Sequence, residues 1–156
     1  MLEAMSDAIA GTAASGYIAD HLWVTPAVQS VHILAIAGLS GSVLMLGARL
    51  TRIAGADLPL KAVDRRFSRW IWWSALVLLV SGIVLVIGEP GRELLNTLFR
   101  VKMLLVLALL GLVWTFQRGL RGHTDAWADG RGVALGIGMG LLWFAIVAAG
   151  RWIAYI

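Results

Sequence analysis

The residue of this sequence best suited to chemistry is His32, an imidazole inside an otherwise apolar run. If a helix begins at Thr25-Pro26, a rise of about 1.5 Å per residue places His32 roughly 9 Å into it. Gln29 lies one turn earlier on the same face. A titratable ring at such depth is a functional-site hypothesis, because lipid offers it no water. The alternative is that His32 only makes a hydrogen bond between helices.

Charged groups are expected at the same level on the other helices. Glu89 closes the second apolar run, Arg100 and Lys102 open the third, and Arg151 lies near the end of the fourth. The cations could reach to the interface, neutralise Glu89, or bind the carboxylates of a cofactor. A haem b needs an imidazole on its iron and cations for its propionates, and a quinone needs hydrogen-bond partners such as His32.

A copper site is a third possibility, since His21 precedes the same helix and would pair with His32. Met45 or Met103 would complete it, although Met45 falls near the opposite end of the helix. No second histidine lies within an apolar run, so a haem would use His21, Lys102 or an open position opposite His32.

Several other chemistries are excluded by composition. The chain has no cysteine, which rules out disulfides, thiolate metal sites and cysteine catalysis. It also contains no catalytic triad, zinc spacing or phosphate-binding glycine motif. No enzymatic reaction is assigned to the chain by itself.

The elements that must position these residues are membrane-spanning helices. Of the 156 residues, 60% are hydrophobic and only 14% are charged. A helix of about 20 apolar residues crosses the roughly 30 Å of hydrocarbon in a bilayer. We therefore predict an all-α fold, a polytopic four-helix membrane bundle forming a single domain over residues 1–156. The expected spans are 27–50, 70–88, 101–117 and 133–150, preceded by an interfacial segment, 1–25, that contains a short helix.

Small residues indicate how the helices pack. Three glycines at four-residue spacing in the last span favour close backbone approach: Gly132, Gly136 and Gly140. A matching stripe on the first span comprises Ser30, Ala37 and Gly41. Packing within the chain is the favoured interpretation, and a homodimer through the glycines is the alternative. Trp152 and Tyr155 are expected to form an aromatic belt.

The distribution of Lys and Arg predicts the orientation. The net charge of +4 is concentrated at the ends of the spans, which indicates membrane topology and no nucleic-acid partner. Six basic residues follow the first span and three follow the third, so nine of the 13 face the cytoplasm if these connections are inside. Both termini then lie outside, on the periplasmic side of a bacterial inner membrane.

Several short segments of the chain also resemble a known family of membrane proteins. The segments 21–26, 31–34, 99–102 and 150–155, with Gly41, resemble an uncharacterised family of small four-helix bacterial membrane proteins. The resemblance covers nearly the whole chain and implies a fold without an established activity.

Two weaker resemblances concern the first and third spans. They are similar to copper-resistance D membrane domains, and the third also to four-helix, haem-b-containing protoporphyrinogen oxidases. That resemblance implies functional roles for His32 and Lys102. The chain departs from the oxidase pattern at Val113, where a further histidine is usual. It departs from the uncharacterised family at Gly47, where an acidic residue is usual, and near Gln117, where a histidine is usual.

Three functions follow from these observations. The leading hypothesis is a haem-b or quinone-binding redox or accessory subunit, with Gln29, Arg100, Lys102 and Arg151 around His32. The second is a structural subunit of a larger membrane complex, and the third is a copper-handling protein.

The orientation can be tested with a reporter that is active only outside the cytoplasm, fused after residue 156. The positive-inside distribution predicts a strong external signal. A signal from a cytoplasmic reporter at the same site would contradict the orientation.

Overall fold

The computed structural model describes residues 2–122, 127 and 129–153, which fold into helices connected by short turns, with no strand among them. Four helices are long and apolar enough to cross a membrane, as predicted: α3 (Val24–Leu50), α4 (Leu60–Gly88), α6 (Thr97–Gly122) and α7 (Gly130–Ile153). Three are short: α1 (Leu2–Ala10), α2 (Ala13–Asp20) and α5 (Pro90–Leu94). The predicted all-α four-helix membrane fold is confirmed.

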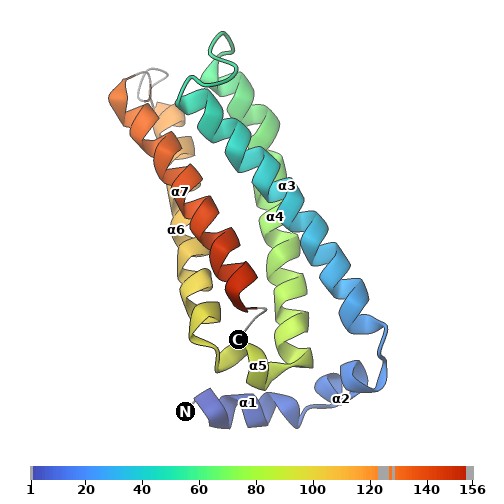
Figure 1. Ribbon diagram of the computed structural model, residues 1–156. Coiled ribbons are helices and arrows are strands. Elements are labelled where there is room, and N and C mark those ends of the chain that lie inside the picture. Colours follow the sequence, from blue (N-terminus) through green and yellow to red (C-terminus); the bar gives the residue numbers. More distant parts are fainter. Residues whose placement is uncertain (1, 123–126, 128, 154–156) are drawn as a thin grey trace.

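The long helices form two hairpins, α3–α4 and α6–α7, which meet mainly where α3 packs against α7 (Figure 1). Helices α1 and α2 run crosswise beneath the bundle, where α1 packs on α5 and α2 on α4. We call this end, which also holds the start of α3 and the last turn of α7, the terminal end. The opposite end, with residues 51–59 and the start of α7, is the loop end.

Both chain ends therefore lie at the terminal end of the bundle, as an even number of spans requires (Figure 1). Which side of the membrane this end faces stays a prediction. Trp152 is exposed there, and its predicted belt partner Tyr155 lies outside the described residues.

The helices extend beyond the predicted spans, most of all in α4. This helix begins ten residues before the predicted start, directly after Pro59, whose extended backbone precedes the first turn. Its first turns are amphipathic, and Val63 is buried against the core. Hydropathy along the sequence does not reveal such turns as part of a membrane helix, because their outer face is charged.

The predicted start of the first span at Thr25-Pro26 is wrong. Helix α3 begins at Val24, so Thr25 and Pro26 lie inside its first turn, and the N-cap residue Trp23 makes no side-chain bond. The interfacial segment holds two helices instead of one. They are separated at Gly11 and Thr12, and the Thr12 hydroxyl accepts a hydrogen bond from the Ser15 amide of α2 at 3.3 Å.

The apolar core is concentrated toward the loop end. Its fully buried members include Leu46 of α3, Ile71 of α4, Phe116 of α6 and Met139 of α7. In the terminal half of the spans, the buried apolar side chains among the described residues are few, such as Ala35 and Ile146. The four helices are thus held together firmly at one end and packed more sparsely at the other.

The closest approach of α3 and α7 uses a glycine on each helix. A Cβ on Gly136 would lie 2.9 Å from the Gly47 carbonyl oxygen and 2.9 Å from Leu50 Cβ. The predicted partner stripe is displaced, since a Cβ on Gly41 would meet nothing within 4 Å. The last-span glycines thus pack within the chain at Gly136, whereas Gly140 faces open space and a homodimer stays a prediction.

Replacing Gly136 with leucine should therefore destabilise the monomer. Overpacking of a tight contact typically costs about 1–3 kcal/mol. Gly140→Leu is the matched control, because a Cβ there meets nothing within 4 Å. Thermal unfolding in detergent should show a lower midpoint for Gly136→Leu alone. Equal midpoints would show that the Gly47–Gly136 contact does not hold the hairpins together.

Candidate functional site

His32 lies in the third turn of α3, on the side that packs against α4. Its ring is half-buried, and Nδ1 lies 2.7 Å from the hydroxyl oxygen of the buried Ser81 on α4. A Cβ on the neighbouring Gly82 would be 3.8 Å from His32 Cε1. Small residues at 81 and 82 thus let the imidazole lie directly against the α4 backbone.

The hydrogen bonds of Ser81 determine which nitrogen of His32 carries the proton. The Ser81 hydroxyl donates its single hydrogen to the Val77 carbonyl oxygen at 2.6 Å. Its oxygen can therefore only accept from His32, so Nδ1 is the protonated nitrogen of the neutral ring. Nε2 is left with a lone pair available to a metal or to a donor. Histidines that bind metals typically have their second ring nitrogen fixed in this way.

Lys102 brings a positive charge close to this ring. The Lys102 ammonium is within electrostatic range of His32 and of the Glu93 carboxylate of α5. A Cβ on Gly150 of α7 would lie 3.8 Å from Lys102 Nζ, so the lysine side chain runs close along α7. His32 is thus in contact with α4 and in electrostatic range of Lys102 of α6, whose side chain lies against α7.

The other predicted site residues are exposed on the surface of the bundle. Gln29 is exposed on α3 and forms no hydrogen bond to another described residue. Arg100 is exposed, and its guanidinium donates to the Thr97 hydroxyl at 2.9 Å. Arg151 is exposed in the last turn of α7. Glu89, which the sequence placed among these cations, pairs with Arg92 at 3.0 Å.

The two histidines proposed for copper have different partners. The His21 ring stacks on Tyr17 with centroids 4.1 Å apart, and its Nδ1 donates to the Tyr17 carbonyl oxygen at 2.9 Å. His32 is held by Ser81 instead. The described residues contain no group of three or more His, Cys, Asp or Glu side chains that could hold a metal. Met45 and Met103 are exposed on the helix surfaces.

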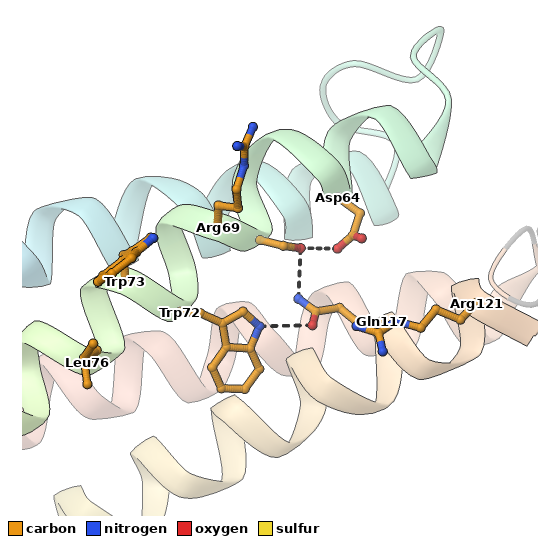
Figure 2. A pocket seen from close by; sticks show the side chains of 8 residues that line it. Asp64, Arg69, Trp72, Trp73, Leu76, Gln117 and Arg121 are labelled. Carbon is orange, nitrogen blue, oxygen red and sulfur yellow. Dashed lines mark hydrogen bonds between the residues drawn. The ribbon is translucent and has the colours of Figure 1, made fainter.

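A second polar cluster, which the sequence analysis missed, lies between α4 and α6 near the loop end (Figure 2). The Trp72 indole donates to Gln117 Oε1 at 3.1 Å, and Gln117 Nε2 donates to the Ser68 hydroxyl at 2.9 Å. Ser68 in turn donates to the Asp64 carboxylate. The i, i+4, i+8 spacing of Asp64, Ser68 and Trp72 was the available signal, since it places all three on one helix face.

Comparison with known proteins gives one family. The model of a family of unknown function, DUF6644, matches residues 8–156. No curated protein and no solved structure matches the chain. The resemblances to copper-resistance D proteins and to protoporphyrinogen oxidases therefore stay predictions.

The His32–Ser81 bond can be tested with Ser81→Ala. Loss of the hydroxyl leaves a buried imidazole N–H without its acceptor, which typically costs about 1–3 kcal/mol. Ser42→Ala is the control, because Ser42 is equally buried but donates only to Gly38 of its own helix. Chemical shifts of ¹⁵N-labelled histidine should also show His32 protonated at Nδ1 in the native protein. An Nε2-protonated ring would contradict the assignment.

Proposed function

We propose that this chain, which belongs to the family of unknown function DUF6644, is a small integral membrane protein that binds a haem b through His32. The observation that supports this proposal is the orientation of the ring by Ser81, which leaves Nε2 unprotonated. Haem iron takes an imidazole nitrogen as an axial ligand through such a lone pair.

The same observation separates haem from quinone. A quinone carbonyl accepts hydrogen bonds and would need an N–H donor, but the neutral ring already donates its N–H to Ser81. Only the reduced quinol, which carries hydroxyl groups, could donate to Nε2. The hydrogen bonding of His32 therefore favours the binding of haem iron over the binding of a quinone.

Sparse packing and positive charge at the terminal end support a large anionic cofactor. Buried apolar side chains are few in this half of the described spans, so a flat macrocycle would displace little of the core. Lys102 supplies a cation near His32, and Arg100 supplies a second near the same end. Such groups suit haem propionates, which carry negative charge.

A bound haem would supply one-electron transfer, which suits a redox or accessory subunit of a larger membrane complex. In this proposal His32 holds the iron and Ser81 keeps the ring in the required tautomer. Lys102 and Arg100 balance the charge of the propionates.

The test is a reduced-minus-oxidised absorption spectrum of protein purified in detergent from cells supplied with a haem precursor. We expect a Soret and an α band that His32→Ala abolishes while membrane insertion is unchanged. His21→Ala is the matched control and should keep both bands. Ser81→Ala should weaken haem affinity about 10- to 100-fold, the usual effect of losing a group that orients a metal-binding histidine.

Other outcomes would replace the proposal. Haem content that is unchanged in His32→Ala would remove His32 from the site. A colourless protein that co-purifies with a partner would favour the structural subunit. Copper in elemental analysis, lost in both His21→Ala and His32→Ala, would favour copper handling.

A further inference from the structure

A cleft opens between α4 and α6 near the loop end, in the opposite half of the bundle from His32. Its volume is about 370 Å³. The lining residues come from these two helices alone: Asp64, Ser68, Arg69, Trp72, Trp73, Leu76, Gln117 and Arg121. Neither the proposed haem site nor the family assignment involves it.

The polar side chains between the helices are already satisfied by one another. Gln117 uses its carbonyl oxygen for Trp72 and its amide nitrogen for Ser68, and Ser68 donates to Asp64 (Figure 2). Side chains held by hydrogen bonds at both ends lose little further freedom when a ligand binds. The network therefore gives the cleft a fixed shape. It also contributes the Asp64 carboxylate to the lining, where the two arginines Arg69 and Arg121 outweigh its negative charge.

Two of these residues are arginines with unused donors. Arg69 follows Ser68 on α4, and Arg121 lies one turn after Gln117 on the antiparallel α6, so both line the cleft, with Arg121 nearer the loop end. Both are exposed, and neither forms an ion pair or hydrogen bond with another described residue. The arginine fork suits phosphate, which it binds through two parallel N–H donors.

The cleft continues from these cations into an apolar surface. Trp73 and Leu76 lie one and two turns beyond Arg69, deeper in the apolar part of α4, and are 65% and 48% exposed. Tryptophan is typical of the level where headgroups meet hydrocarbon. Cations at the interface followed by an exposed apolar wall match the two chemical parts of a phospholipid.

We propose that this cleft binds an anionic phospholipid, with its phosphate between Arg69 and Arg121 and an acyl chain along Trp73 and Leu76. Basic pockets between membrane helices on the cytoplasmic side recognise anionic headgroups, and the loop end is the predicted cytoplasmic side. A free phosphate would share the arginines but would gain nothing from the apolar wall. A zwitterionic lipid would share the wall but would bring no net charge.

The experiment is native mass spectrometry of the full chain released from nanodiscs of phosphatidylcholine containing one-fifth phosphatidylglycerol. We expect one retained phosphatidylglycerol, enriched over phosphatidylcholine. The double variant Arg69→Gln/Arg121→Gln should lower retention about tenfold or more, since each arginine near anionic lipid contributes about 1 kcal/mol. The control is Arg65→Gln/Arg118→Gln, which removes the same charge from the same helices outside the cleft.

Three results would overturn the proposal. Equal loss in the control pair would show diffuse attraction to the basic surface. Equal retention of both lipids would show that charge is not recognised, and displacement by millimolar inorganic phosphate would show a phosphate site that does not use the acyl chain. If the glutamine pair does not fold, Arg69→Lys/Arg121→Lys keeps the charge but loses the fork. Retention should then fall about threefold or more, and an unchanged value would also overturn the proposal.

Discussion

The structure depends on the absence of water inside a bilayer, which leaves each polar group to find a partner within the protein. Small hydroxyls meet this demand locally: Ser30 donates to the Pro26 carbonyl and Thr115 to the Leu112 carbonyl of its own helix. The described residues contain no buried side-chain nitrogen or oxygen without a hydrogen-bond partner. Larger polar groups cannot be satisfied in this way, so they determine which helices lie together.

Three contacts between helices show the result. His32 joins α3 to α4 through Ser81, and Gln117 joins α6 to α4 through Ser68. Between α3 and α7 the contact is one of shape, because Gly47 and Gly136 let the backbones approach. Helix association in lipid relies on such close packing and on hydrogen bonds, since burying leucine away from lipid gains little.

The two candidate sites occupy opposite ends of the bundle and differ in chemistry for reasons of depth and packing. Near His32 the spans are sparsely packed and the polar group is a neutral ring that a single hydroxyl orients. At the loop end the core is dense, and arginines flank a cleft with a hydrogen-bonded floor. The dense end fixes the hairpins relative to each other, and the haem is proposed at the end where the helices share fewer buried side chains.

The sequence by itself determined the four spans and placed His32 in the first turns of one of them, because hydrophobic length and helical rise need no tertiary information. It also showed that Gly136 allows close packing. It did not determine that Ser81 is the partner of His32, that Gly47 rather than Gly41 meets Gly136, or that Trp72 and Gln117 bond. Those facts depend on the rotation and relative height of neighbouring helices. Many polar and small residues along a span are chemically equivalent partners, and only the packing of the whole bundle selects among them.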